Sequence, residues 1–258
     1  MRRLFILPLL LASPALASTP LALHPGEELI YRVAWGVFGH AGEIHITARS
    51  ETNDGQPCTL VVTTTSTRGV LRGLYQFDAR AESVFSDSTN RMLVHTERSA
   101  SGKKPTDTLM TFDYKARTAE YRDFIRPERN QTVQVPGGDP MDLITCLVQT
   151  RVWNLKPGDQ RDVVVMFEEE PYELTFHALG YETVETPIGT FNALVLEPRM
   201  ERTAAKGMFK RGSNVRVWIS QDEQHLPVKF EVEFKFGVGV STLTSYTAPP
   251  VAHADSRP

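Results

Sequence analysis

Cysteine is almost missing from this sequence, which holds only Cys58 and Cys146 among its 258 residues. Two thiols are too few for the disulfide framework of a small secreted scaffold, and their spacing matches no zinc site built from paired cysteines. A free cysteine behaves as a small apolar residue, and nothing in the sequence brings these two within bridging distance. We therefore expect Cys58 and Cys146 to be unpaired rather than joined by a disulfide.

Long apolar runs are missing beyond the first residues. Residues 4–11 form an apolar run that follows Arg2 and Arg3 and precedes a small-x-small motif at residues 15–17. This order is that of a secretory signal peptide, and the run is far shorter than the ~20 residues that a membrane-spanning helix needs. We expect residues 1–17 to be a cleaved signal peptide and the mature protein to start near Ser18, in the periplasm. Neither cysteine lies at that new N-terminus, so an acylated lipoprotein is not expected.

An excess of positive charge is missing as well. The formal net charge is −3, and the loss of Arg2 and Arg3 makes the mature chain more negative. Domains that bind nucleic acids carry the opposite balance. We therefore expect no nucleic-acid partner, whereas peripheral contact with a membrane stays open.

The motifs of common active sites are also missing. The seven histidines form no HExxH pair, no Gly-x-Ser-x-Gly elbow is present, and no glycine-rich phosphate loop follows a strand pattern. The acidic run Glu168–Glu170 offers metal-ligating side chains, but a charge run before Pro171 is typical of a solvated turn. We expect no catalytic residues, no metal and no cofactor.

What the sequence does contain is a period of two. Apolar and polar side chains alternate over residues 29–37, 44–48, 172–178 and 228–236, which places one face of each strand in the core and the other in solvent. Residues 163–167 are apolar on both faces and indicate a central, covered strand. With about a dozen such segments, the pattern predicts a mainly β protein. We expect a single antiparallel half-open β-barrel or strongly curved sheet with one mid-chain helix.

The boundaries of this domain follow from the same patterns. We expect one β-rich domain over residues 18–246. Residues 247–258 are rich in proline, alanine and serine and are expected to form a disordered tail.

The expected helix lies near the middle of the chain. From Asp139 to Leu155 apolar residues recur every three or four positions, which is typical of an amphipathic helix. Asp139 suits the N-cap and Pro140 the first helical position. An exposed apolar stripe would be a liability, so we expect this helix to be a lid over a cavity or an open mouth of the sheet.

Two stretches combine basic and apolar side chains, as an anionic amphiphile would require. They are Arg68–Tyr75 and Arg199–Arg216, and the alternative is a mobile surface hairpin that merely packs on the sheet. The expected lining and mouth of a ligand cavity draw on these stretches, the helix and two strands: Trp35, Leu71, Tyr75, Ile144, Met208, Phe209, Phe230 and Phe234.

A family resemblance rests on several short motifs in order. Pro25–Tyr31, Asp139–Leu143, Gly189–Ala193 and Val217–Asp222 resemble the bacterial exported family called domain of unknown function 3108. The resemblance runs from Leu23 to about Tyr246, and it implies no established activity.

A more distant resemblance concerns one strand and its exit. Trp218, an acidic turn at Asp222, and Leu226-Pro227-x-Lys229 are similar to a pattern in the periplasmic lipoprotein carriers typified by LolA, LolB and RseB. This resemblance implies a curved, half-open antiparallel barrel with helices plugging a hydrophobic cavity. The chain departs from that group by having fewer evident helices and longer hairpins.

We interpret the sequence as that of a soluble periplasmic protein that binds a hydrophobic or amphiphilic ligand, or an envelope component, without catalysis. The expected partner is a lipid, an acyl chain or a lipoprotein. One alternative is a structural or protein-interaction module of the envelope, which a filled barrel would favour. Two others are a small outer-membrane β-barrel, which the internal helix and the polar C-terminus disfavour, and a hydrolase. The oligomeric state is not determined by the sequence.

Overall fold

The computed structural model describes residues 19–101, 104–206, 209, 215–234 and 237–250. The predicted signal peptide and residues 251–258 of the predicted tail lie outside the described residues. Of the other tail residues, Thr247 still belongs to the last strand. Pro250 lies close to Gly26, because a Cβ at that glycine would come within 2.4 Å of its ring.

Within the described part of the chain, fifteen strands form one sheet in the order β8-β7-β6-β5-β4-β3-β2-β1-β15-β14-β13-β12-β11-β10-β9. The strands are β1 (Glu28–Trp35), β2 (Phe38–Asn53), β3 (Gln56–Thr67), β4 (Phe77–Ser86), β5 (Met92–Ser101), β6 (Thr106–Asp113), β7 (Thr118–Asp123), β8 (Gln131–Gln134), β9 (Met141–Asp142), β10 (Gln160–Phe167), β11 (Glu170–Thr186), β12 (Gly189–Arg199), β13 (Val215–Ser220), β14 (Pro227–Phe234) and β15 (Gly237–Thr247). The helices are α1 (Gly69–Leu74) and α2 (Leu143–Gln149), with 3-10 turns η1 (Pro127–Arg129) and η2 (Thr150–Val152).

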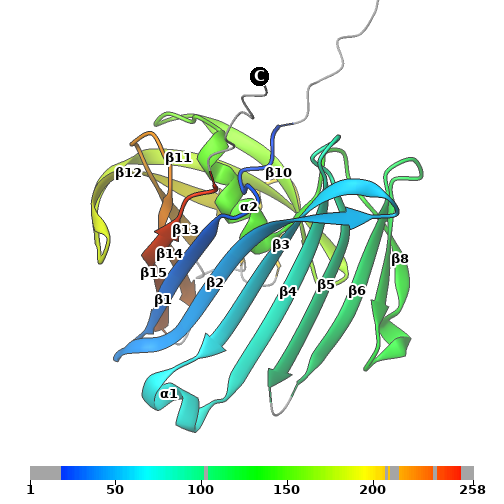
Figure 1. The fold of residues 1–258 in the computed structure, drawn as a ribbon, viewed down its shortest axis with the longest axis horizontal. Coiled ribbons are helices and arrows are strands. Elements are labelled where there is room, and N and C mark those ends of the chain that lie inside the picture. Colours follow the sequence, from blue (N-terminus) through cyan, green and yellow to red (C-terminus); the bar gives the residue numbers. More distant parts are fainter. Residues whose placement is uncertain (1–18, 102–103, 207–208, 210–214, 235–236, 251–258) are drawn as a thin grey trace, which may run out of the picture.

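The sheet is strongly curved and does not close on itself, as predicted (Figure 1). All neighbouring strands are antiparallel except the two-residue strand β9, which is parallel to β10. The first and last strands, β1 and β15, pair in the middle of the sheet, so its free edges are β8 and β9. The prediction of a central strand at residues 163–167 was wrong. That strand is β10, next to an edge, and α2 packs against it.

The predicted alternation is confirmed by the inner face of the sheet. Leu29 and Tyr31 of β1 lie opposite Ile46 and Ile44 of β2, and the first three of these are fully buried. Leu174 and Phe176 repeat the pattern in β11. Each such side chain contributes about 1.5–3 kcal/mol when buried, so the two-residue period determines which face curls inward.

The mid-chain helix is shorter than predicted and begins later. Asp139 is not its N-cap, since its carboxylate pairs with Arg91 at 2.8 Å. Pro140 disfavours helical backbone at the residue before it, and Met141 and Asp142 are held in β9 by pairing with β10. The N-cap is Asp142, whose Oδ1 accepts a hydrogen bond from the Thr145 amide at 2.9 Å. Its Oδ2 accepts a hydrogen bond from Ser83 of β4 at 2.7 Å, which fixes the helix to the sheet.

One end of the curved sheet is closed by α2 and the segment before β1. The Gln149 side chain accepts a hydrogen bond from the Ala22 amide at 2.9 Å and donates one to the Pro20 carbonyl at 2.6 Å. Arg151 forms a buried ion pair with Glu27 at 2.6 Å. Leu21, Ala22 and Leu23 are buried, so this segment is part of the core.

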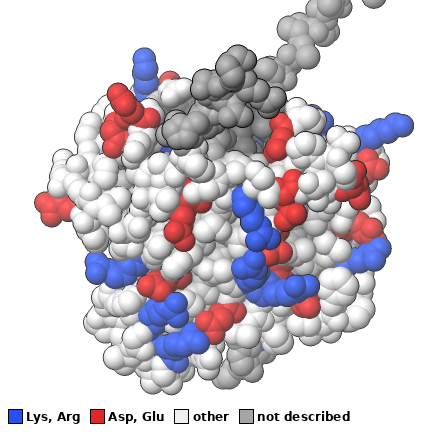
Figure 2. Space-filling model, in the orientation of Figure 1, with Lys and Arg blue, Asp and Glu red and all other residues white. Residues whose placement is uncertain are grey.

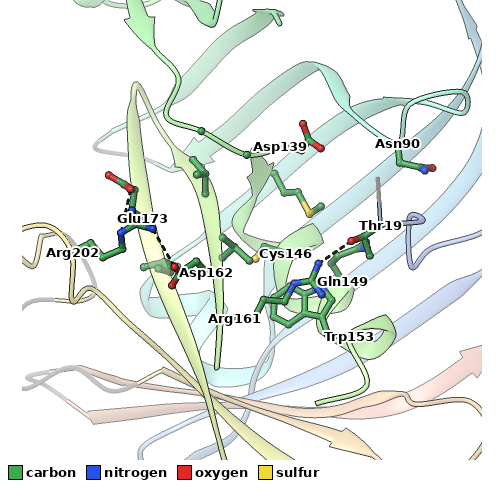
Figure 3. Close-up of a pocket in the computed structure, with 16 residues that line it drawn as sticks. Thr19, Asn90, Asp139, Cys146, Gln149, Trp153, Arg161, Asp162, Glu173 and Arg202 are labelled. Carbon is green, nitrogen blue, oxygen red and sulfur yellow. Dashed lines mark hydrogen bonds and ion pairs between the residues drawn. The ribbon is translucent and has the colours of Figure 1, made fainter. Parts of the chain in front are cut away.

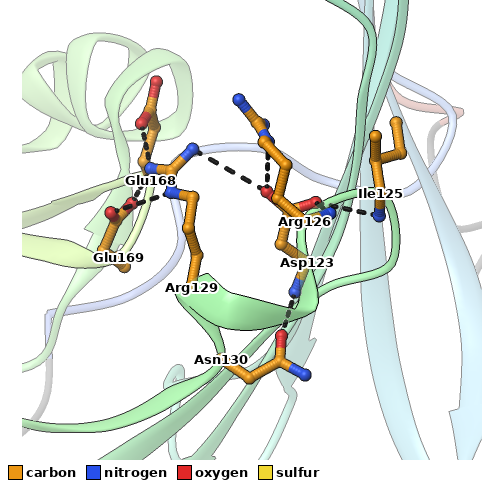
Figure 4. Close-up of polar contacts among 7 residues, drawn as sticks. All are labelled: Asp123, Ile125, Arg126, Arg129, Asn130, Glu168 and Glu169. Atoms are coloured by element: carbon orange, nitrogen blue, oxygen red, sulfur yellow. Dashed lines mark hydrogen bonds and ion pairs between the residues drawn. The ribbon is translucent and has the colours of Figure 1, made fainter.

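Side chains rather than backbone bonds connect the two free edges. Arg129 of η1, beside β8, pairs with Glu168 at 2.6 Å and with Glu169, both in the turn between β10 and β11 (Figure 4). Asp123 of β7 faces Arg129 at 3.7 Å and Arg126 at 2.9 Å. The acidic run considered as a metal site therefore bridges the opening of the barrel.

No helix of the described chain is both long and apolar enough to span a membrane.

Candidate functional site

An apolar pocket of about 410 Å³ lies at the end of the sheet that carries α1. In Figure 1 this end is at the bottom, and α2 occupies the upper part of the curve. The pocket is lined by α1, its flanks and the adjoining ends of four strands: Val33, Trp35, Ala41, Gly42, Thr65, Ser66, Thr67, Leu71, Tyr75 and Phe77. Its volume falls within the range of about 300–1,000 Å³ that is usual for small-molecule sites.

The floor of the pocket is formed by side chains of β1 and β3 that point to the inner face of the sheet. Val33 is the next inward residue after the buried Tyr31, and Thr65 lies opposite Ile44. Tyr31 is itself fixed, because its hydroxyl donates to the Pro227 carbonyl at 2.8 Å. The floor of the pocket is therefore continuous with the rigid core.

Trp35 forms one wall, and two glycines of β15 make room for it. A Cβ at Gly239 would lie 3.3 Å from the indole ring, and one at Gly237 would lie 3.4 Å from the indole nitrogen. Gly237 also has a φ of +133°, which side chains rarely tolerate. The spacing of these glycines thus holds the ring of Trp35 beside the pocket.

The opposite wall is α1, which is anchored by charge rather than by packing. None of its residues is buried. Arg72 forms a two-pronged ion pair with Asp78, both bonds 2.9 Å long, and Arg68 pairs with Glu43 at 2.6 Å. The hydrogen bonds from Arg72 and Arg68 hold the pKa values of the Asp78 and Glu43 carboxyls below their usual range.

The turn into α1 depends on Gly69. Its φ is +55°, and a Cβ there would approach the His40 carbonyl oxygen to 2.8 Å. This turn leaves Val70 and Leu74 exposed at 72% and 75%, while Leu71 faces the pocket. Elements with few buried contacts open at low free-energy cost, so α1 is suited to act as a movable cover.

Three of the eight residues predicted for a ligand cavity meet at this pocket: Trp35, Leu71 and Tyr75. Ile144 does not, because α2 lies toward the other end of the sheet and Ile144 packs against the core there. Phe230 is 5% exposed in the core, its ring 4.9 Å from that of Tyr31. Phe209 packs beside Tyr172 with ring centroids 6.2 Å apart. Met208 lies outside the described residues, as does the side chain of Phe234.

The pocket therefore has a different cover from the one expected. The mid-chain helix was expected to cover a cavity or an open mouth of the sheet. With Leu147 and Val148 buried, α2 closes one end of the curved sheet, but it does not cover the pocket under α1. The sequence stretch Arg68–Tyr75 was identified as apolar and basic without being recognised as a helix. Six residues give too short a periodic signal for that. Val33 could have been found, since it shares the inward face of residues 29–37.

The basic stretch Arg199–Arg216 is neutralised where the structure describes it. Arg199 and Arg216 both pair with Glu197, at 2.8 and 3.0 Å, and Lys206 pairs with Glu170 at 2.7 Å. On the face shown in Figure 2, positive and negative side chains are interspersed rather than segregated. The described part of this stretch thus offers no concentrated positive field to an anionic surface.

Both cysteines are free and buried, as predicted, with Cys58 in β3 and Cys146 in α2. Burial raises the pKa of the Cys146 thiol well above its usual range. Across the described residues, no group of three or more His, Cys, Asp or Glu side chains is placed to hold a metal ion.

Comparison with known families decides the relationship of this chain. The model of the family described as protein of unknown function DUF3108 matches residues 30–244. The chain belongs to this family. That membership confirms the resemblance carried by the short motifs, and residues 30–244 of the DUF3108 protein contain every strand except the first residues of β1 and the last residues of β15.

One solved structure supports the architecture. The DUF3108 protein is similar to a β-barrel-like protein of the domain of unknown function DUF1849 from Brucella abortus, with a TM-score of 0.58 and 5% identity. That match covers 88% of this chain and 99% of the other. The lipoprotein LppX from Mycobacterium tuberculosis matches with a TM-score of 0.26 and 14% identity over 88% of each chain. No match was found among curated proteins. At these identities, the likeness concerns the fold alone.

Proposed function

We propose that this DUF3108 protein is an exported, non-catalytic binding protein that holds one apolar or amphiphilic molecule, such as an acyl chain, in the pocket beneath α1. The observation that carries this proposal is the lining of the 410 Å³ pocket. Its side chains are mostly aliphatic or aromatic, and they include Trp35 of β1 and Leu71 of α1. Ligand sites are typically apolar cavities with a few polar groups that fix orientation.

The polar groups of the pocket fit an apolar occupant. The hydroxyl of Thr67 is already used, since it accepts a hydrogen bond from the Phe77 amide at 3.0 Å. Tyr75, half exposed at the mouth, brings an aromatic body with a polar tip. A chain of methylene groups could pack against the apolar side chains inside the pocket, and a polar head would reach solvent beside Tyr75.

The same pocket bears on the alternative of an interaction module with a filled core. The core beneath the pocket is packed, with Tyr31 and Phe230 buried there, so the space lies at the end of the sheet that carries α1. The space under α1 therefore favours ligand binding at this end of the sheet. The placement in the periplasm rests on the signal-peptide pattern of residues 1–17.

The first prediction tests the pocket with one substitution on its wall and one beside it. Leu71→Asp brings a carboxylate into contact with any apolar occupant, and desolvating that group costs at least ~1–3 kcal/mol. We expect the mature protein to bind the fluorophore N-phenyl-1-naphthylamine, a fatty acid to displace it, and Leu71→Asp to weaken its affinity about tenfold or more. Fluorescence titration gives both affinities.

Val70→Asp is the matched control, because Val70 is the preceding residue of the same helix and does not line the pocket. We expect its affinity to stay within about twofold of the parent protein. Both variants should unfold within ~0.5 kcal/mol of the parent, since α1 buries no residue. Failure of the parent protein to bind the fluorophore, or equal losses in both variants, would contradict the proposal.

A further inference from the structure

A second pocket, of about 240 Å³, lies beside α2, at the end of the sheet away from α1 (Figure 3). Its apolar lining includes Met141 and, on the face of the sheet that carries Arg161, Val163 and Leu174. The lining also includes Arg161 of β10 itself, with Trp153 and Thr19. The apolar and polar groups together resemble a site for a small molecule with one polar end.

Arg161 is the unusual group in this pocket. Its Nη2 donates one hydrogen bond, to the Thr19 hydroxyl at 2.8 Å, and its guanidinium lies 4.9 Å from the centroid of the Trp153 ring. No carboxylate of the described residues lies within ion-pair distance of it. Burial lowers the pKa of Arg161, but a guanidinium stays protonated at neutral pH. The site therefore holds a partly buried positive charge without a counter-charge.

The acids around the pocket are already used. Asp162 and Glu173 face Arg202 at 3.1 and 3.9 Å, and Asp139 faces Arg91 at 2.8 Å. Each of these carboxylates is therefore neutralised by an arginine of the same chain, whereas Arg161 has no such partner among the described residues. An unpaired buried charge is costly, so a bound anion would recover free energy that the protein alone does not.

The neutral polar groups nearby do not compete for such an anion. Both ends of the Gln149 amide are bonded to the segment before β1. The Cys146 thiol is neutral, because burial raises its pKa. The remaining N–H groups of Arg161 are thus the available donors, and they form the planar fork that matches a carboxylate.

We infer that this pocket binds a small carboxylate with a short apolar body, its carboxylate on Arg161 and its alkyl part against Met141, Val163 and Leu174. The volume, below that of most ligand pockets, suits a short chain rather than a long one. The site is separate from the pocket under α1 and does not depend on the function proposed for it.

Hexanoate is the probe, with hexan-1-ol as its uncharged counterpart and inorganic phosphate as an anion without an apolar body. Calorimetric titration of the mature Leu71→Asp protein, in which the pocket under α1 no longer takes apolar molecules, should show hexanoate binding, and neither of the other two should bind measurably. Arg161→Gln should weaken hexanoate binding by about tenfold to hundredfold, the range for a hydrogen bond to a charged group. Arg122→Gln removes one positive charge outside the pocket, from an exposed pair with Glu120, and should keep the affinity within about threefold.

A second measurement separates ligand binding from a structural role. Removing an uncompensated cation should leave the melting temperature of the ligand-free Arg161→Gln protein equal to or above that of the parent. Equal binding of hexan-1-ol in the Leu71→Asp protein, equal losses in Arg161→Gln and Arg122→Gln, or no hexanoate binding would overturn the inference. If Arg161→Gln does not fold, Arg161→Lys decides, because it keeps the charge without the fork and must bind hexanoate more weakly.

Discussion

At the scale of single residues, the charged groups of this protein divide by whether they have a partner. Arg151 and Glu27 pair while buried, and Arg72 and Asp78 pair at the edge of the apolar pocket. Arg161 differs from Arg151 and Arg72, because it is partly buried and its polar partners in the described chain are a hydroxyl and an aromatic ring. The paired arginines Arg151 and Arg72 therefore stabilise the fold, whereas Arg161 is the arginine to which we assign a ligand.

The two thiols give a second prediction at the residue scale. Cys58 and Cys146 are both buried, and burial raises the pKa of each, so almost no thiolate is present near neutral pH. Since the thiolate is the reactive form, we expect neither to react with dithionitrobenzoate in the native protein at pH 8, and both to react after unfolding in guanidinium chloride. Rapid labelling of the native protein, or a mass that rises by two hydrogens on reduction, would contradict this.

At the scale of elements, the two edge strands β8 and β9 do not pair with each other, so the sheet is open between them. The edges are connected by Arg129, which contacts Glu168, Glu169 and Asp123. Burial alone would raise the pKa of Glu169, but the hydrogen bond from Arg129 outweighs it and the pKa lies below 4.5. Burial would also raise the pKa of Asp123. Hydrogen bonds from the backbone amides of Arg126 and Ile125, together with the positive charge of Arg126, outweigh burial and lower this pKa below its usual value.

The third prediction concerns the pH dependence of this closure. A carboxylate with a lowered pKa in the folded state stabilises the fold fully above its unfolded value, and the contribution is lost as pH falls through the folded value. Stability should therefore decline below about pH 4.5. Arg129→Gln should lower the free energy of unfolding at pH 7 by about 1–3 kcal/mol and flatten this acid decline. Denaturant unfolding between pH 7 and 3 measures both effects.

Arg122→Gln is the control for this experiment. Arg122 pairs with Glu120 at 2.6 Å, but both side chains are more than half exposed, and such pairs contribute little. We expect a change within ~0.5 kcal/mol and an unaltered acid decline. If Arg129→Gln behaved in the same way, the edges would have to be held together by other contacts.

At the scale of the whole molecule, the first and last strands of the described chain pair in the middle of the sheet. β15 lies between β1 and β14, and its Leu243 is fully buried. Each half of the sheet therefore depends on a strand contributed by the last residues of the domain. Such long-range pairing also predicts slow folding, since loop closure precedes the contacts that stabilise it.

The fourth prediction follows from this position of β15. A chain that ends at Pro250 should unfold at the same temperature as the full mature protein, because residues 251–258 belong to the predicted tail. A chain that ends at residue 236 should show no cooperative unfolding, because it lacks the strand that joins the two halves. Circular dichroism during heating distinguishes the two. A cooperative transition in the shorter chain would show that one half folds alone.

The fifth prediction concerns export. Residues 1–17 have the pattern of a signal peptide, so the protein recovered from a periplasmic extract should begin within a few residues of Ser18. N-terminal sequencing measures this. Recovery from the cytosol with Met1 intact would show that the leader is not processed.

The sequence by itself determined the fold class, the family and most of the strands, although β7, β8 and β9 were not predicted. The two-residue period is a local property, because alternate side chains point to opposite faces whatever the partner strand is. For that reason Leu29, Tyr31, Leu174 and Phe176 could be assigned to the core. The buried state of Cys58 and Cys146 followed from residue type in the same way.

Only the tertiary structure decided where the pocket lies and what covers it. The extent of α2 depends on Asp142 bonding to Ser83, 59 residues away in sequence, and the cover α1 depends on ion pairs from Arg68 and Arg72 rather than on an apolar stripe. Trp35, Leu71 and Tyr75 meet at one pocket while Ile144 and Phe230 go to the core. That division depends on register and curvature, which are set by contacts between distant strands and leave no local pattern to read.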